Sequence, residues 1–125
     1  MDIYTLVKEL RRGLETPRAF VCKKVEIEGY SQPIELRGLS MDELDNVGEH
    51  SSDPEEQNAY LVYMASPTLQ KAAEQLLKLE VISYGWEVMN AFHKADVNKM
   101  AQIAAEASSE YNAPKVRLIE EEIKN

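Results

Sequence analysis

The sequence has a single cysteine, Cys22, so the chain cannot form an internal disulfide. The fold therefore does not depend on an oxidising compartment, and we expect an intracellular protein. The chain opens with Met1-Asp2-Ile3-Tyr4, which places an acid where a signal peptide carries basic residues. No apolar run approaches the roughly 20 residues that a membrane span needs. We expect a soluble, cytoplasmic protein that is neither secreted by the standard route nor embedded in a bilayer.

Positive charge is also scarce. The chain carries 14 basic and 22 acidic side chains, for a net charge of -8. Nucleic acid would be repelled unless a basic patch were set apart, so we do not expect it as the main ligand. Basic residues gather between Lys8 and Lys24, and acids gather between Asp42 and Glu56. This segregation indicates either two solvated faces of opposite sign or a steering surface for a partner of complementary charge.

The sequence also lacks the motifs that are typical of phosphate-binding, metal-binding and catalytic sites. The glycines stand singly at positions 13, 29, 38, 48 and 85, so there is no phosphate-binding loop. His50 lies in a polar segment without metal-ligand spacing, and we expect an exposed histidine there. We expect His93 at a helix end, where it would interact with the negative end of the dipole. Cys22 falls in an alternating segment as a small, partly buried residue. The sequence predicts no catalytic residue, no metal site and no cofactor, and thus a protein that is not an enzyme.

Hydrophobic periodicity predicts an α+β fold that is predominantly α-helical. We expect one domain over residues 1–125, with an N-terminal helix in 1–18, a β-hairpin in 19–39 and a helical part in 40–125. About five short helices should pack as a bundle in that last part. Two strands alone are marginal in water, so the hairpin should lean on helices or on a partner strand.

The first 39 residues contain both the helical period of hydrophobicity, about 3.6 residues, and the alternating period of a strand. Residues 2–14 predict an amphipathic helix that Asp2 caps and Pro17 closes. Residues 19–28 alternate, and Lys23 interrupts their apolar face, which indicates an edge strand or a side chain that extends to solvent. Residues 29–33 supply the turn, and residues 34–37 alternate again. The apolar stripe of the predicted helix consists of Ile3, Leu6, Val7, Leu10 and Leu14.

Helix-capping residues mark where the helices of the helical part begin. A capping box, Ser40 to Glu43, predicts a helix that ends near Gly48, followed by a mobile polar loop over 48–53. Asp53-Pro54 and Ser66-Pro67 predict two more helix starts. A helix over 81–92 would use Gly85 for the close approach of a neighbour. A further helix is predicted after Asp96, which would cap it. A last short helix is predicted to begin at Asn112-Ala113-Pro114 and to end at Lys124.

Amphipathic aromatic residues suggest where a partner would bind, because such side chains are favoured at protein interfaces. Tyr84-Gly85-Trp86 is the densest cluster, and it indicates either core packing or a groove between helices. Met41 and Met100, with two further methionines, would make such a surface adaptable. The predicted partner-binding residues are Tyr60, Tyr63, Met64, Tyr84, Trp86 and Met89.

The order of several segments carries a resemblance. The hairpin ends in Ile34-Glu35-Leu36-Arg37-Gly38-Leu39-Ser40-Met41-Asp42-Glu43-Leu44, and a helix follows through Asn58-Ala59-Tyr60-Leu61-Val62-Tyr63. An Ala65-Ser66-Pro67-Thr68-Leu69 break and a Tyr84-Gly85-Trp86-Glu87-Val88 stretch come next. Together these segments resemble the tail assembly chaperones of siphophages, particularly those of phages and prophages of Gram-positive bacteria.

The resemblance implies a non-enzymatic protein of the bacterial host cytoplasm. Proteins similar to this one hold the long tape measure protein, help recruit tail tube protein around it and are absent from the finished virion. Some are also made as a longer, frameshifted product. The implied partners are proteins, neither nucleic acid nor membrane, and self-association into a homo-oligomer stays open.

Two other readings remain. Another small acidic chaperone or adaptor, such as a secretion chaperone, would share this size and charge, although secretion chaperones usually build their dimer from a larger sheet. A small enzyme or ligand-binding domain would need a deep pocket with convergent polar groups, and the sequence offers no candidate set for one.

Overall fold

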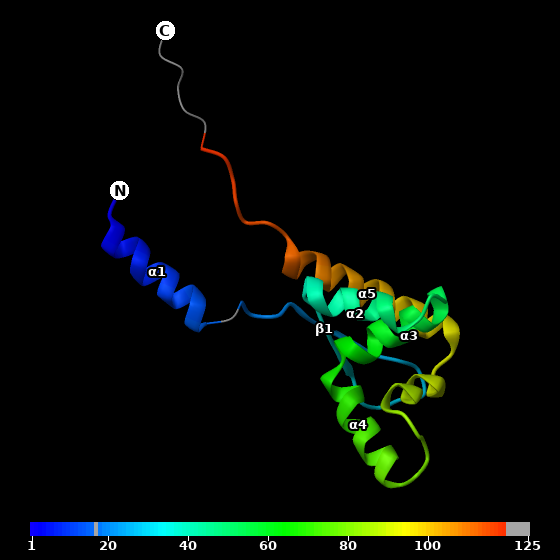
Figure 1. Cartoon of the computed structure of the whole chain (residues 1–125). Helices are drawn as coiled ribbons and strands as arrows, with labels where there is room; N and C mark the ends of the chain where they lie inside the picture. The colour runs from blue at the N-terminus through cyan, green and yellow to red at the C-terminus, as the bar shows by residue number, and fades with distance from the viewer. Residues whose placement is uncertain (17, 120–125) are drawn as a thin grey trace.

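The computed structural model describes residues 1–16 and 18–119, and it is an α+β fold dominated by helices (Figure 1). The N-terminal helix and the hairpin form as predicted. The predicted closure at Pro17 lies outside the described residues. In chain order the elements are α1 (Ile3–Glu15), β1 (Cys22–Val25), β2 (Ile34–Arg37), α2 (Met41–His50), α3 (Pro54–Ala65), α4 (Pro67–Lys78), the 3-10 helix η1 (Gly85–Ala91) and α5 (Lys94–Asn112).

The hairpin pairs β1 with β2 in antiparallel register, with Cys22 opposite Arg37 and Val25 opposite Ile34. Alternation sends Ile34 and Leu36 into the core, as a half-buried strand requires. Lys23 lies on the inner face of β1, and its ammonium reaches Glu110 of α5 at 3.3 Å. The apolar stem is therefore covered while the charge reaches the surface. Cys22 itself is exposed, so the expectation that it is partly buried is wrong.

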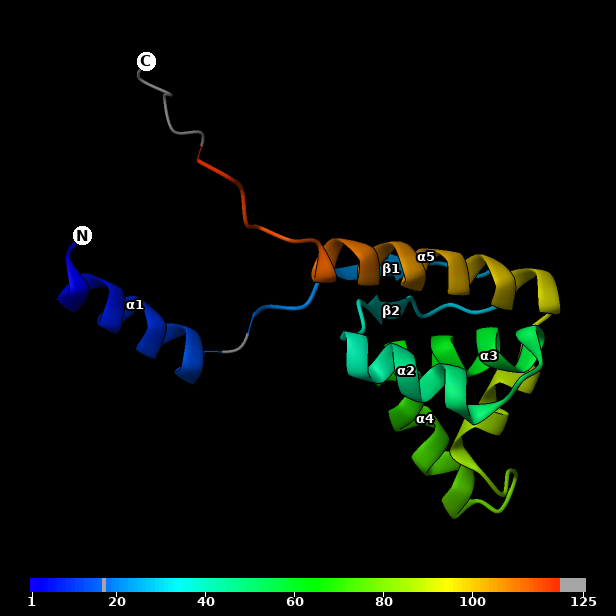
Figure 2. The same cartoon turned by 45° about the horizontal axis from the view of Figure 1, so that its top comes forward.

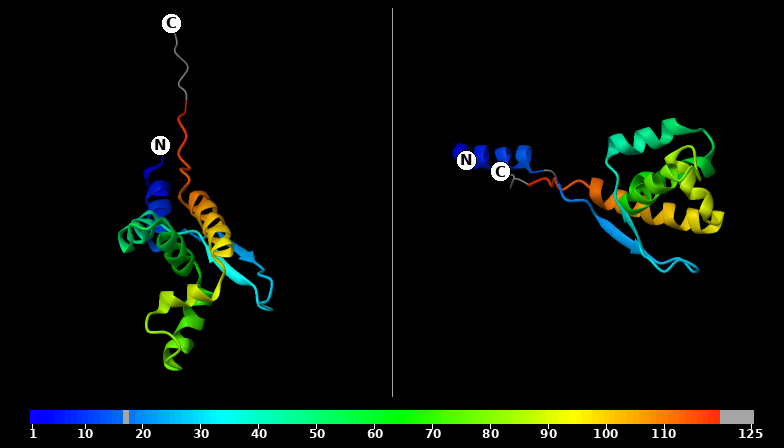
Figure 3. Two further views of the ribbon diagram at one scale, coloured as in Figure 1. Left: turned by 90° about the vertical axis from the view of Figure 1, so that its right-hand side faces the viewer. Right: turned by 90° about the horizontal axis from the view of Figure 1, so that it is seen from below.

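The core lies where α3, α5 and the hairpin meet. Small residues of α5 such as Ala104 and Ala107 are fully buried, so neighbouring backbones come close. Gly38, just after β2, sits so near the Ala107 carbonyl that a Cβ there would overlap it. This close contact explains why a glycine ends the strand. In Figure 3 the hairpin runs alongside α5.

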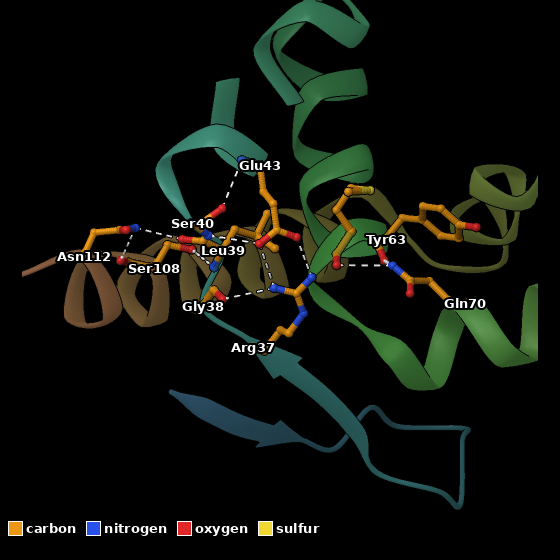
Figure 4. A network of polar contacts seen from close by, with 10 residues as sticks. Arg37, Gly38, Leu39, Ser40, Glu43, Tyr63, Gln70, Ser108 and Asn112 are labelled. Atoms are coloured by element: carbon orange, nitrogen blue, oxygen red, sulfur yellow. Dashed lines mark hydrogen bonds and ion pairs between the residues drawn. The ribbon is translucent and has the colours of Figure 1, made fainter. Parts of the chain in front are cut away.

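A polar network fixes the corner between β2, α2 and α5 (Figure 4). The buried Ser108 hydroxyl accepts a hydrogen bond from the Leu39 N–H at 2.8 Å and donates to the Ala104 carbonyl at 2.7 Å. The Asn112 side-chain amide donates to the Leu39 carbonyl at 2.8 Å. Ser40 and Glu43 form the predicted capping box of α2. Both backbone groups of Leu39 thus find partners on α5, which a buried chain segment needs.

The helix α1 stands apart from this body, as Figures 1 and 2 show. Asp2 caps it as predicted, accepting from the Tyr4 and Thr5 N–H groups. None of its residues is buried. Its amphipathic pattern is therefore real, but its apolar stripe covers nothing in the structure.

Three predicted segments differ from the structure. The helix α2 continues past Gly48 to His50, so the predicted loop over 48–53 shrinks to the link between α2 and α3. Residues 81–92 hold a turn and η1 instead of one α-helix. The last predicted helix is wrong over 113–119, where the backbone has no regular structure. The end of that prediction, including Ile123 and Lys124, lies outside the described residues.

The start of α5 also differs, because His93 and not Asp96 occupies the N-cap. The predicted contact of His93 with a helix C-terminus is therefore wrong, and Asp96 instead places its charge in the first turn. No helix in the described part of the chain has the length and apolar character that crossing a membrane requires.

Candidate partner-binding groove

The structure divides the predicted partner-binding residues between surface and core. Tyr84 and Trp86 of the η1 segment keep 62% and 40% of their surface exposed. Tyr60, Tyr63 and Met64 of α3 are half-buried. Met89 is only 3% exposed and belongs to the hydrophobic core, as does Met100. Met89 can therefore form the floor of a groove, while the adaptable methionine surface predicted from the sequence loses two of its members.

An aromatic stack joins three elements. The His50 ring at the end of α2 lies parallel to the Tyr60 ring, with centroids 3.8 Å apart and planes 4° from parallel. The Trp86 ring meets His50 edge-on at 5.5 Å. Tyr84 stacks on Trp86 at 5.6 Å. Offset and edge-on arrangements are the favourable geometries for such rings, so the stack holds α2, α3 and η1 together.

Gly85 explains how η1 comes so close to α3. A Cβ at Gly85 would overlap the Tyr63 hydroxyl, and its next neighbour would be the Tyr63 ring carbon Cζ at 3.1 Å. The predicted close approach at Gly85 is confirmed, and its neighbour is Tyr63. Burial of the Tyr63 phenol is the main cause that raises its pKa.

Two adjoining cavities extend from this stack. The first, of about 180 Å³, is lined by His50, Tyr60 and Trp86 over Met89. The second, of about 410 Å³, lies between the start of α3 and the start of α5. They share Glu56, Ala59, Met89 and Asn90, so they form one depression. We call this depression the aromatic–acidic groove; it is lined by His50, Asp53, Glu55, Glu56, Ala59, Tyr60, Trp86, Met89, Asn90, Phe92, Lys94, Val97 and Asn98.

The groove has an aromatic end and a charged end. Asp53 caps α3 through the Glu55 N–H at 3.1 Å, and the acids of the first turn suit the positive end of the helix. Lys94 pairs with Glu55 at 3.0 Å, and that hydrogen bond is the main cause that raises the pKa of Lys94. The charged end holds three carboxylates, those of Asp53, Glu55 and Glu56, and only one ammonium, that of Lys94, so its net charge is negative. The lining therefore suits a partner that presents an apolar side chain next to a basic one.

Sequence reasoning missed two contributors to the groove. His50 is exposed, as expected, but it has the closest ring contact in the stack. Glu56 lines both cavities. Their positions depend on how α2 turns into α3, and no local spacing signals that turn. Among the described residues, no group of three or more histidine, cysteine, aspartate or glutamate side chains is arranged to hold a metal ion.

Comparison with known proteins adds no relative: no protein-family model, no curated protein and no solved structure matches this chain.

Proposed function

We propose that this chain is a tail assembly chaperone of a siphophage or prophage. In this proposal it works in the bacterial host cytoplasm, binds the tape measure protein and promotes the assembly of tail tube protein around it. It acts by binding another protein and catalyses no reaction. The proposal rests on the resemblance of the hairpin end, the α3 sequence and the Tyr84-Gly85-Trp86 stretch to that group.

The observation that carries the proposal is the aromatic–acidic groove. Two of the resembling segments, around Tyr60 and around Trp86, meet at its aromatic end although they are far apart in the sequence. Half-exposed tryptophan and tyrosine beside a pocket are typical of protein interfaces, because one part of the ring is dry and the other is wet.

The chemistry of the groove suits a long, amphipathic helical segment. An apolar side chain of that segment would enter between Tyr60 and Trp86, over Met89. A lysine or arginine one turn away would reach the carboxylates of Glu55 and Glu56. The same ammonium or guanidinium would be attracted by the aromatic faces. A groove of this size supports modest affinity, which a chaperone needs so that it can release its client.

The experiment compares partner capture with stability. Tagged chain and the tape measure protein are co-expressed, and the wild type is compared with Trp86→Ala. We expect Trp86→Ala to reduce capture by about tenfold or more while the melting temperature falls by only a few degrees. Tyr4→Ala is the matched control, since Tyr4 is an 83% exposed aromatic residue of α1, away from the groove. Equal losses of capture and of stability would mean that Trp86 is only part of the core.

A second experiment identifies the partner without assuming it. The tagged wild type and Trp86→Ala are purified from the native host, and the co-eluting proteins are identified by mass spectrometry. The proposal expects a very long helical protein, encoded immediately downstream, that is lost in the variant. Capture of a secreted effector instead would reject the tail role in favour of a secretion chaperone.

A further inference from the structure

The apolar stripe of α1 is a surface without a covering element. The helix has 13 residues and none is buried. Isolated helices shorter than about 12–15 residues are marginal in water, and an amphipathic helix owes most of its stability to packing of its apolar face. The stripe residues retain these exposed fractions: Ile3 56%, Leu6 38%, Val7 56%, Leu10 57% and Leu14 87%.

The body of the same chain offers a groove that could cover such a stripe. A cavity of about 480 Å³ opens between the hairpin turn, α4 and the end of η1. No charged residue lines it. The Tyr30 hydroxyl donates to the Ala91 carbonyl at 2.8 Å and holds the turn in place. We call it the hairpin groove; it is lined by Gly29, Tyr30, Ser31, Gln32, Pro33, Ile34, Thr68, Leu69, Ala72, Leu76, Val88, Ala91 and Phe92.

Charge favours the same pairing. Residues 1–18 carry four basic and three acidic side chains, whereas the rest of the chain carries ten basic and nineteen acidic ones. Arg11 lies at the edge of the apolar stripe, next to Val7 and Leu14, while Lys8 and Arg12 lie one helical turn apart on the opposite face of α1. Glu26 and Glu28 line a cavity that shares residues 29–32 with the hairpin groove, so they form an acidic rim. A weakly basic arm thus faces an acidic body with an apolar groove.

The position of α1 points to a second copy as the occupant. Thr16, which ends the helix, has extended backbone angles, and β1 then runs from Cys22 toward the hairpin turn. In Figures 2 and 3 α1 lies beyond the start of β1, at the end of the hairpin opposite the turn. To reach the hairpin groove of the same chain, α1 would have to fold back along the hairpin. The hairpin groove of a second molecule could bind α1 without this rearrangement.

We propose that α1 of one copy docks in the hairpin groove of a second copy, so that the chain self-associates head to tail. The dimensions match, since α1 is about 20 Å long and α4, which forms one wall of the groove, is about 18 Å long. The contact joins two different surfaces, so it repeats from copy to copy until a ring closes. The hairpin groove and the aromatic–acidic groove share only Phe92, which leaves the second groove free for a client.

The test is sedimentation of the full-length chain over a range of concentrations. The wild type should exceed its monomer mass of 14.2 kDa and dissociate on dilution. Val7→Gln with Leu10→Gln removes apolar contacts from the stripe and should weaken association more than about tenfold. Glu9→Gln is its matched control on the polar face of α1. Ala72→Arg, on the exposed wall of the groove, should weaken association equally, and Gln75→Arg on the same helix should not.

A mixing experiment makes the assignment specific. The Val7/Leu10 variant keeps an intact groove, and the Ala72 variant keeps an intact arm. Each should be a monomer alone, while their mixture should form one-to-one dimers that grow no further. Ala72→Arg leaves α1 unchanged, so the result does not depend on whether the substituted arm stays helical.

Four outcomes would overturn the proposal. The wild type could stay a monomer at every concentration. It could form an oligomer that neither variant affects. Monomeric variants that fail to pair on mixing would show that α1 of one copy does not dock in the hairpin groove of another. A monomeric wild type that loses thermal stability in the Val7/Leu10 variant would show that α1 docks in its own groove.

Discussion

The guanidinium of Arg37, at the end of β2, binds both carboxylate oxygens of Glu43 in the first turn of α2. The distances are 2.6 Å from Nη2 to Oε2 and 3.0 Å from Nη1 to Oε1 (Figure 4). The same carboxylate accepts the Ser40 N–H at 3.1 Å. The hydrogen bonds from Arg37 are the main cause that lowers the pKa of Glu43 to about 2. One carboxylate thus links a strand end to a helix start.

This pair predicts a defined acid sensitivity. The folded pKa of Glu43 is depressed from 4.5 to about 2. Its contribution to the free energy of unfolding is therefore present above about pH 4.5 and lost as the pH falls toward 2. A shift of this size would correspond to about 3 kcal/mol, and because the pair is only part-buried, solvent screening reduces the expected contribution to about 2 kcal/mol. In urea titrations, Glu43→Gln should be less stable than the wild type at pH 7, and the difference should shrink toward pH 2.

The control for this prediction is Glu35→Gln on β2. Glu35 approaches Lys24 at 3.9 Å, and both side chains are largely exposed. An exposed pair contributes little, so this variant should unfold like the wild type. A Glu43→Gln penalty that stays constant from pH 7 to pH 2 would refute the assigned role of the carboxylate.

Ser108 should be one of the most sensitive polar positions in the core. Its hydroxyl is the acceptor for the Leu39 N–H, and the residue is 2% exposed. Ser108→Ala would leave that buried N–H without a partner, at a cost of about 1–3 kcal/mol. We expect a lower urea midpoint with an unchanged denaturant slope. Ser109→Ala, at the exposed neighbour, should change stability by less than about 0.5 kcal/mol.

The contact between Gly85 and Tyr63 predicts a substitution and its rescue. Gly85→Ala would force the Tyr63 ring to move, and overpacking of this kind costs about 1–3 kcal/mol. Tyr63→Phe removes the hydroxyl that the new Cβ would meet, so the double variant should recover part of the loss. Thermal melts of the four proteins measure this coupling. Gly48→Ala, which has nothing within 4 Å of its Cβ, should be neutral or stabilising, and a purely additive cycle would contradict the contact.

The helix starts were the most predictable part of the fold. Asp2, Ser40, Asp53 and Ser66 all cap the helices that follow them, because a cap depends on residues within one turn of it. The end of α4 was harder to place. There Glu80 adopts a φ of 60°, and the Val81 N–H bonds to the Leu76 carbonyl at 3.0 Å. Glycine is the usual residue at that position, and without it no turn was predicted here: a further α-helix was expected over 81–92, where the structure has a turn followed by η1.

The other parts of the fold and the site could not be predicted because they depend on tertiary contacts. Residues 113–119 have a helical pattern, but Val116 and Ile119 are 92% and 86% exposed, so no packing against the body stabilises a helix in this short segment. The sequence placed Tyr60 and Trp86 at the same site and missed His50, because ring stacking between α2 and α3 depends on the turn between them. The hairpin groove was missed for a similar reason. It joins residues 29–34 to α4 and η1, which no local period connects.

Trp86 also offers a direct optical test of the aromatic–acidic groove, because it is the only tryptophan in the chain. Its ring is 40% exposed in the free protein, so its fluorescence should be open to quenching by acrylamide. When purified tape measure protein, the proposed client, is added, burial of the indole should shift the emission to shorter wavelength and reduce quenching. The Val7→Gln, Leu10→Gln variant should give the same shift, since its changes lie on α1. Calorimetric binding without any change in Trp86 emission would place the client on another surface of the protein.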